Sequence, residues 1–195
     1  MTHKVLVVDD EEIIRDSLFY ILEKEGYEVE KAENGKSAYD KLVNSHFDLV
    51  ITDIEMPVMK GTELLEKIKT LDIQTSVIVI TAFGSLDTAI SALRNGASDY
   101  ILKPVEFDEL IIKAKRLFEV RDLLLENRVL REEIHRKYDF ENIVGKSNSI
   151  RKVYEMIEAV AETDSTVLIS GNSGTGKELV ARALHYKSHR KNKPF

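Results

Sequence analysis

The fold of this chain is decided by one stretch, Phe47-Asp48-Leu49-Val50-Ile51-Thr52-Asp53, which is followed by Ile54-Glu55-Met56-Pro57 and by Gly61. A short apolar run between turn residues is typical of a buried β-strand. Pro57 ends the strand, because proline has no N–H for a ladder and restricts the residue before it. The strand delivers Asp53 to its carboxyl end, where open α/β sheets place their ligands. An aspartate in that place is a phosphate acceptor, a metal ligand or only a helix cap.

Strand patterns and helix patterns alternate on both sides of this stretch. Further apolar runs predict strands over 4–8, 28–32, 76–81 and 99–102. Helical spacing follows each strand, with helices predicted between 13 and 22, around 38–43, over 61–71 and 86–95, and from Phe107 onward. Gly26 and Gly96 suit the ends of the first and fourth helices. Five strands joined by helices through short connections predict a parallel, doubly wound sheet of the flavodoxin-like α/β class.

The composition of the 195-residue chain excludes several functions. Its net charge of −6 leaves no basic surface for nucleic acid, so we expect no direct DNA binding. The absence of cysteine excludes disulfides and thiolate metal sites and suits a reducing cytoplasm. No apolar run approaches the ~18 residues of a membrane helix, and the amino terminus is too short for a signal-peptide core. We expect a soluble, cytoplasmic protein that does not contact the membrane.

The residues that end the predicted strands carry the chemistry. Asp9 and Asp10 follow the first strand, Asp53 ends the third, Thr81 ends the fourth and Lys103 follows the fifth. Parallel strands end at one edge of the sheet, so these side chains converge. Three carboxylates together are unfavourable unless a cation neutralises them, and Mg²⁺ is the natural partner of oxygen ligands. With the ion, the ammonium and the hydroxyl around it, Asp53 is placed to attack an electron-poor phosphorus.

Each of these residues also has a purely structural interpretation. Asp9 or Asp10 can cap the first helix, Thr81 can cap the fourth, and Lys103 can be a solvated lysine. Their occurrence at successive strand ends favours a site.

Residues 1–119 resemble a response-regulator receiver domain of the two-component systems. The matching pieces are Val7-Val8-Asp9-Asp10-Glu11, the stretch from Asp53 to Gly61, Thr81-Ala82 and Lys103-Pro104. The resemblance implies that Asp53 accepts phosphate from the phosphohistidine of a histidine kinase. It also implies Mg²⁺ bound by Asp9, Asp10, Asp53 and the backbone carbonyl of Glu55. Tyr100 matches the family's switch aromatic, whose rotamer follows the threonine; a half-buried core tyrosine is the structural alternative.

The helix that begins at Phe107 continues past the point where such a domain should close. Five residues keep a heptad spacing, with Val, Asn and Ile at one core position and Leu at the other: Val120, Leu123, Asn127, Leu130 and Ile134. This arrangement favours a parallel two-stranded coiled coil. The run covers little more than two heptads, so an amphipathic linker helix over 120–138 is the alternative. We expect a homodimer that forms through the receiver and this linker.

A second motif lies near the end of the chain. Gly171-Asn172-Ser173-Gly174-Thr175-Gly176-Lys177 fits G-x-x-x-x-G-K. It follows a predicted strand over 166–170 and opens a predicted helix over 178–185, which is the context that a phosphate-binding loop requires. Backbone N–H groups would surround a triphosphate, with Lys177 on the outer phosphates. Glu178 stands where the general motif has Ser or Thr; a flexible glycine-rich loop is the alternative.

Residues 139–195 resemble the start of the AAA+ domain of sigma-54-dependent activators of the nitrogen-regulation type. The resemblance rests on the stretches 140–147 and 166–171, on 174–178 and on Pro194-Phe195. In that family a glutamate after the lysine is usual, whereas Asn172 stands where Glu is more common. The resemblance implies ATP at Gly171, Gly174, Thr175, Gly176, Lys177 and Glu178, and sigma-54 RNA polymerase as a partner of the full-length protein only.

The chain stops before the other catalytic parts of such a domain, by the same resemblance. With few strands to close a core, we expect residues 139–195 to be poorly ordered or dependent on neighbours. We also expect no ATP hydrolysis, so that the chain is a self-dephosphorylating phosphoacceptor and not an enzyme.

Taken together, the sequence predicts a phosphorylated regulator that controls a sigma-54-dependent ATPase module. A stand-alone receiver adaptor without an output domain is the alternative. A phosphatase with an aspartate nucleophile is disfavoured, because the place after the first strand reads Asp9-Asp10-Glu11-Glu12 and not Asp-x-Asp. A working ATPase is disfavoured by the early stop.

Overall fold

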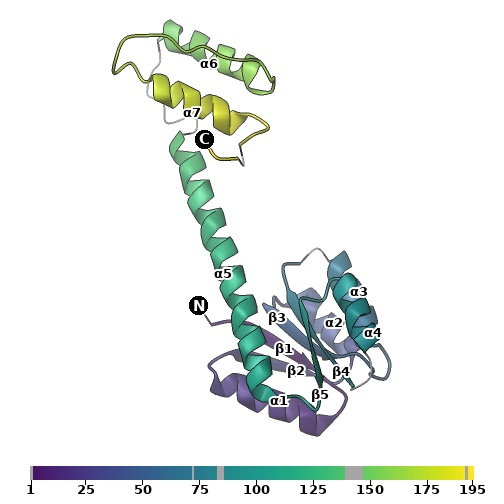
Figure 1. The fold of residues 1–195 in the computed structure, drawn as a ribbon. Helices are drawn as coiled ribbons and strands as arrows, with labels where there is room; N and C mark the ends of the chain where they lie inside the picture. Colours follow the sequence, from purple (N-terminus) through teal and green to yellow (C-terminus); the bar gives the residue numbers. More distant parts are fainter. Residues whose placement is uncertain (1, 72, 83–85, 139–146, 192) are drawn as a thin grey trace. The chain divides into compact units, whose positions relative to one another are not determined.

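The computed structural model describes residues 2–71, 73–82, 86–138, 147–191 and 193–195 (Figure 1). Side chains are described for the same residues except 86–89 and 133–138. The chain divides into two compact units, Met1–Asp122 and Leu123–Phe195.

The first unit is built on one five-stranded sheet. Its strands have the order β2-β1-β3-β4-β5, and every neighbouring pair is parallel. The strands are β1 (Lys4–Val8), β2 (Glu28–Ala32), β3 (Leu49–Asp53), β4 (Ser76–Ala82) and β5 (Asp99–Lys103). The helices between and after them are α1 (Glu12–Lys24), α2 (Gly35–Asn44), α3 (Gly61–Thr70), α4 (Leu86–Arg94) and α5 (Phe107–Tyr138). The predicted doubly wound, flavodoxin-like sheet is confirmed.

The sheet is buried on both faces, because helices cover each of them (Figure 1). Successive side chains of a strand point to opposite faces, so a strand covered twice needs a continuous apolar run. In β3 all five residues are buried, for this reason. One face packs against buried residues of α2 and α3, among them Leu42 and Leu64. The other face packs against α1 and α5, through Leu18 and Leu110.

Helix α5 packs on the sheet only along its first part. Leu110, Ala114 and Phe118 are buried, with Ile111 and Leu117 partly buried beside them, as the sequence predicted. Further along, the heptad residues Val120, Leu123 and Leu130 are each at least half exposed. Asn127 is also exposed, whereas the side chain of Ile134 lies outside the described residues. Among the residues described, no helix is both long enough and apolar enough to cross a bilayer.

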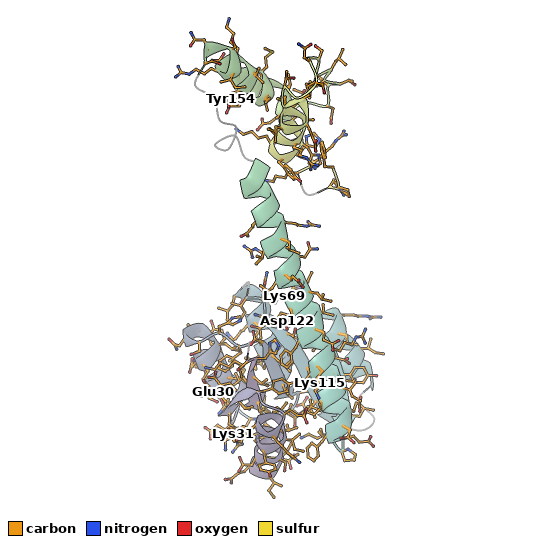
Figure 2. All side chains as sticks on the ribbon, turned by 90° about the vertical axis from the view of Figure 1, so that its left-hand side faces the viewer. Glu30, Lys31, Lys69, Lys115, Asp122 and Tyr154 are labelled. Carbon is orange, nitrogen blue, oxygen red and sulfur yellow. The ribbon has the colours of Figure 1, made fainter. Side chains whose placement is uncertain are left out.

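The end of the packed part of α5 is anchored at the amino edge of the sheet. The Arg121 guanidinium lies 2.9 Å from an oxygen of Asp48 and also donates to the carbonyl of Gln74. The next residue, Asp122, has a carboxylate oxygen 3.4 Å from His3 Nε2 (Figure 2, where Asp122 is labelled). His3 in turn has its Nδ1 3.8 Å from Asp48. These contacts fix the helix to the sheet at the last residue of the first unit.

The described part of the second unit contains the end of α5 and two further helices, α6 (Asn148–Ala161) and α7 (Lys177–Lys187). Helix α7 lies close to the helix predicted over 178–185. The two further helices bury Ile157 and Ala161 of α6 and Ala183 of α7. The Ser147 hydroxyl caps α6 by accepting the N–H of Ile150 at 3.3 Å. The break at Gly145 predicts a loop over 138–146; Tyr138 is instead the last residue of α5, and 139–146 lie outside the described residues.

The strand predicted over 166–170 is wrong. The chain there is irregular, and Leu168 is 91% exposed. An apolar run becomes a strand only when a neighbouring strand pairs with its N–H and C=O groups. The described part of the second unit contains no other strand that could do so.

Gly61 allows an unusually close approach next to the end of β3. A Cβ atom at this position would lie 2.0 Å from the carbonyl oxygen of Asp53. The Gly61 N–H also donates to the carbonyl of Ile54 at 2.9 Å. The first turn of α3 is therefore tied directly to the backbone that carries Asp53, and only glycine fits there.

We predict that Gly61→Ala destabilises the chain by about 1–3 kcal/mol, because the added methyl group forces this backbone contact apart. Urea unfolding followed by circular dichroism measures the change. Glu66→Ala, at an exposed position of the same helix, is the control and should stay within about 0.5 kcal/mol of the wild type. Equal stability of the two variants would show that the loop absorbs the methyl group freely.

Candidate functional site

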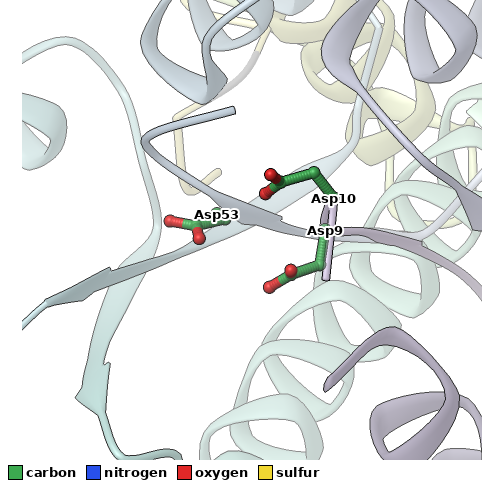
Figure 3. Close-up of side chains that lie close together, drawn as sticks. All are labelled: Asp9, Asp10 and Asp53. Carbon is green, nitrogen blue, oxygen red and sulfur yellow. The ribbon is translucent and has the colours of Figure 1, made fainter. Parts of the chain in front are cut away.

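The carboxyl edge of the sheet gathers the polar residues that the sequence singled out. Asp9 follows β1 directly, Asp53 is the last residue of β3, and Lys103 is the last of β5. Asp9, Asp10 and Asp53 each offer an oxygen, and these atoms all lie within 4.8 Å of one another. Figure 3 shows the three side chains grouped at this edge. Asp9 and Asp53 are buried, whereas Asp10 is exposed and opens the site to solvent.

Lys103 is the cation of this cluster. Its Nζ donates to Asp53 Oδ2 at 2.6 Å and to Glu11 Oε1 at 3.2 Å, and it lies 3.5 Å from Asp9 Oδ2. Burial lowers the pKa of Lys103, but the hydrogen bond and charge of Asp53, together with Asp9 and Glu11, outweigh burial and raise the pKa above its usual value. Lys103 is therefore charged at neutral pH. The contact with Glu11 was not foreseen, although Glu11 continues the acidic run Asp9-Asp10.

One oxygen of Asp9 has no hydrogen-bond partner. Asp9 Oδ1 accepts the N–H of Glu11 at 2.8 Å, but Oδ2 is fully buried and accepts no hydrogen bond within the described part of the chain, with the Lys103 ammonium 3.5 Å away. Burial raises the pKa of Asp9, against the opposing effects of the Glu11 N–H and the Lys103 charge. A buried acceptor without a partner costs about 1–3 kcal/mol. The position therefore suits a cation that binds this oxygen.

The donor atoms fit a small, hard divalent ion. All three ligands are carboxylates, and one of them faces solvent, so the site matches the preference of Mg²⁺ for oxygen atoms and retained waters. Glu55 lies two residues beyond Asp53. Its N–H donates to Asp53 Oδ1 at 3.3 Å, and its side chain pairs with Lys60 at 2.7 Å.

Thr81 and Tyr100 lie on the neighbouring strands. Asp53 is in register with Ile80, so Thr81 stands one residue further along β4. Thr81 is buried and in register with Leu102 of β5. Tyr100 precedes Leu102 by two residues, so its side chain leaves β5 on the same face, and it is half-buried. The fold thus brings Asp9, Asp10, Asp53 and Lys103 into direct proximity and places Thr81 beside them.

The glycine-rich loop of the second unit curls around one carbonyl oxygen. Gly174 and Gly176 have φ angles of +80° and +82°, which favour glycine. The Asn172 carbonyl accepts the Thr175 hydroxyl at 2.8 Å and Lys177 Nζ at 2.5 Å. Lys177 is also the first residue of α7, so the loop lies at a helix amino terminus, where anions bind.

A cavity of about 510 Å³ adjoins this loop; it is lined by Gly174, Gly176, Lys177, Glu178 and Leu179. The Glu178 carboxylate pairs with Arg182 at 2.8 Å, one turn along α7. Gly171 stands at the start of the loop, where a Cβ atom would lie 3.1 Å from the Thr175 hydroxyl.

Two sequence families match the chain, one for each half. Residues 5–115 match the Response regulator receiver domain family, and residues 143–195 match the Sigma-54 interaction domain family. The sheet with its acidic edge thus defines a signalling domain, and the chain belongs to the response regulator receiver family. It carries, in addition, a segment of the domain found in sigma-54 activators.

Several known proteins resemble the chain over nearly its whole length. The regulatory protein AtoC of Escherichia coli K12 is 36% identical over 193 residues, which cover 99% of this chain and 42% of AtoC. The crystal structure of NtrX from Brucella abortus is 40% identical and superposes with a TM-score of 0.64, covering 100% of this chain and 42% of NtrX. The chain thus spans less than half the length of these relatives. A receiver domain from Methanospirillum hungatei is 41% identical with a TM-score of 0.59, over 63% of this chain and 98% of that protein.

The expectation that the chain is not an enzyme is wrong for its family. Sigma-54 activators are AAA+ ATPases, and residues 143–195 match their interaction domain. NtrX from Brucella abortus has been crystallised with ADP and with ATP. The family that residues 143–195 match is therefore a family of ATPases, contrary to the expectation.

We predict that Asp9→Asn has opposite effects with and without a divalent cation. Folding raises the pKa of Asp9 above its usual value, so the ionised carboxylate opposes folding. Stability therefore falls as the pH rises from the usual pKa of an aspartate to the raised pKa in the folded state. The variant should therefore melt at a higher temperature than the wild type at neutral pH in chelator. Its affinity for Mg²⁺ should fall at least about tenfold, so that Mg²⁺ no longer raises its melting temperature as it does for the wild type.

Thermal melts with and without Mg²⁺, together with calorimetric titration, measure both effects. The control is Asp16→Asn, since Asp16 pairs with Lys31 at 2.8 Å and this hydrogen bond lowers its pKa. That variant should lose a little stability and keep Mg²⁺ binding. Unchanged Mg²⁺ affinity in Asp9→Asn would remove Asp9 from the cation site.

Proposed function

We propose that this chain is the receiver-bearing part of a two-component response regulator. In this proposal, Asp53 accepts a phosphoryl group from the phosphohistidine of a histidine kinase and so controls a sigma-54-dependent, transcription-activating ATPase module. The observation that carries the proposal is the Asp53–Lys103 pair beside an oxygen of Asp9 that accepts no hydrogen bond, at the sheet edge of a chain that belongs to the receiver family.

The transfer is a displacement at phosphorus. An oxygen of the Asp53 carboxylate forms the new bond to phosphorus, the bond from phosphorus to the histidine nitrogen breaks, and the imidazole leaves. The Lys103 ammonium, 2.6 Å from Asp53, orients the carboxylate and offsets the charge of the phosphoryl oxygens. Asp9, Asp10, Asp53 and the backbone carbonyl of Glu55 would hold Mg²⁺, which neutralises negative charge on the phosphoryl group when it is bound. Hydrolysis at the same site would return Asp53 to its free form.

Thr81 and Tyr100 would report the phosphorylation. The Thr81 hydroxyl, on the strand next to Asp53, would donate to the phosphoryl group, and the Tyr100 ring would follow into the space vacated beside it. This proposal is supported by the shared face of the two side chains on β4 and β5.

The glycine-rich loop would bind ATP in the complete protein. Gly171, Gly174, Thr175 and Gly176 would supply backbone N–H groups, and Lys177 would exchange the Asn172 carbonyl for the outer phosphates. Glu178 follows the lysine. Sigma-54 RNA polymerase would be the partner of the complete protein, as the family match over 143–195 suggests.

The phosphorylation is testable by intact mass. Incubation with acetyl phosphate and Mg²⁺ should add one phosphoryl group to the wild type and none to Asp53→Asn, because the amide is no nucleophile. The control is Asp40→Asn, an exposed aspartate on α2 that pairs with Lys36 and should leave the mass gain intact. A phosphoryl group that still attaches to Asp53→Asn would refute the assignment.

We further propose that two chains pair along the heptad positions of α5. Val120, Leu123 and Leu130 are apolar side chains at least half exposed to solvent, which is costly for a helix in isolation. Pairing of two such helices would bury these three side chains, with Asn127 at a central core position. A single asparagine at such a position favours a parallel coiled coil of two helices. Phosphorylation would change how the two chains pair.

The pairing predicts a dimer by multi-angle light scattering, with an association weakened at least about tenfold by Leu130→Asp, because a charge then enters the seam. Leu125→Asp is the matched control, since position 125 falls opposite the seam in the heptad, and it should keep the dimer. A wild-type monomer in both the phosphorylated and the unphosphorylated form would exclude this mode of pairing.

A further inference from the structure

Lys113 has its ammonium held by three oxygen atoms at the free edge of β5. Its Nζ donates to Asp99 Oδ1 at 2.8 Å and to the carbonyl of Tyr100 at 2.5 Å, and Glu109 Oε1 lies 3.1 Å away. An ammonium group has three N–H donors, and here each has an oxygen within reach. The position of the charge is therefore fixed from both β5 and α5.

The aromatic ring of Tyr100 lies under this fixed charge. Lys113 Nζ is 5.0 Å from the ring centroid, within the range of a cation–π interaction. Tyr100 packs with the residues on the α2 and α3 face of the sheet, whereas Lys113 belongs to α5, on the other face. The two side chains can meet only around the edge strand β5. The contact with Lys113 therefore holds the ring toward the outer edge of the sheet.

The backbone of Tyr100 takes part in the same arrangement. Its N–H donates to Asp99 Oδ1 at 2.8 Å, and its carbonyl accepts from Lys113. Both polar groups of this residue are thus satisfied by side chains and not by a sixth strand. Asp99 and Lys113 hold the residue and its ring as one unit.

We propose that Lys113 is a positioning residue that holds the Tyr100 ring at the edge of β5 and opposes its movement toward Thr81. The proposal rests on the proposed function of Asp53, Thr81 and Tyr100. Because three oxygen atoms fix the ammonium, it cannot follow the ring inward, so the attraction is lost when the ring moves. Lys113 thereby sets how readily phosphorylation of Asp53 shifts the receiver to its second state.

The charge of Lys113 persists through the physiological pH range. Burial lowers its pKa, but the hydrogen bonds with Asp99 and Glu109 outweigh burial and raise the pKa above its usual value. A cation–π contact at a partly exposed site then biases the ring position by about two- to fivefold. A ligand that binds the second state better gains the same factor in apparent affinity when the bias is removed.

The test uses the 195-residue chain with beryllofluoride and Mg²⁺, since beryllofluoride mimics a phosphoryl group on an aspartate. Lys113→Met keeps the apolar stem but removes the charge, and should lower the half-saturating beryllofluoride concentration by about two- to fivefold. Lys113→Arg should restore the wild-type value. Lys115→Met is the matched control, because Lys115 carries the same charge on the same helix, pairs with Glu25 at 2.7 Å and should change nothing (Figure 2).

A double-mutant cycle with Tyr100→Leu separates ring positioning from a general effect on stability. In the Tyr100→Leu background, Lys113→Met should no longer change the half-saturating concentration. Fluorine NMR of protein labelled with 3-fluorotyrosine reports the ring directly, and the Tyr100 resonance is identified by its loss in Tyr100→Phe. This resonance should shift in Lys113→Met and stay unchanged in Lys115→Met. If Lys113→Met unfolds because Asp99 is left unpaired, Lys113→Met with Asp99→Asn replaces it throughout.

The outcomes distinguish this inference from the proposed function. An unchanged half-saturating concentration in Lys113→Met, or an equal change in the Tyr100→Leu background, overturns the role of Lys113 while phosphorylation of Asp53 stands. Failure of beryllofluoride to bind the wild type at Asp53 overturns the proposed function itself.

Discussion

The structure of the first unit depends on the balance of negative charge at the carboxyl edge of its sheet. Asp9, Asp10 and Asp53 lie so close together that their mutual repulsion would disfavour burial. Lys103 offsets part of this charge through its direct contact with Asp53, but Asp9 keeps a buried oxygen without a hydrogen bond. The negative charge of the three carboxylates is therefore only partly compensated by the Lys103 ammonium. A site that accepts a phosphoryl group reversibly needs such uncompensated negative charge, because a bound cation then neutralises it and offsets the charge of the phosphoryl oxygens.

The sheet brings these residues together because all its strands run in one direction. Parallel order places the carboxyl ends of β1, β3, β4 and β5 at the same edge, although the residues are almost a hundred positions apart in the chain. The apolar run of β3 makes this possible, since only a strand buried on both faces can stand in the middle of the sheet. Gly61 completes the arrangement by letting α3 begin directly against the backbone of Asp53.

Periodicity was sufficient to predict the sheet, its helices and the residues at its acidic edge. Each of those elements is specified locally, by an apolar run or by a helical face, and parallel strand ends then follow from geometry alone. The strand over 166–170 failed for the opposite reason, because its formation depends on neighbours that the described residues do not supply. The contacts of Lys103 with Glu11 and of Lys113 with Tyr100 were equally beyond prediction, since the sequence does not indicate which distant oxygen a partly buried lysine side chain meets.

The hydrogen bonds of Asp99 and Lys113 with the Tyr100 backbone affect how chains can associate at the outer edge of β5. An outer strand with unpaired N–H and C=O groups is a template on which another chain can add a strand, and proteins block this with charged side chains. At β5 the side chains of Asp99 and Lys113 hydrogen-bond the N–H and C=O of Tyr100, and at the opposite margin β2 carries three charged residues, Glu28, Glu30 and Lys31. Both margins of the sheet thus resist continuation into a neighbouring molecule. Association through helical surfaces, such as the proposed pairing along α5, does not require either margin to accept a further strand.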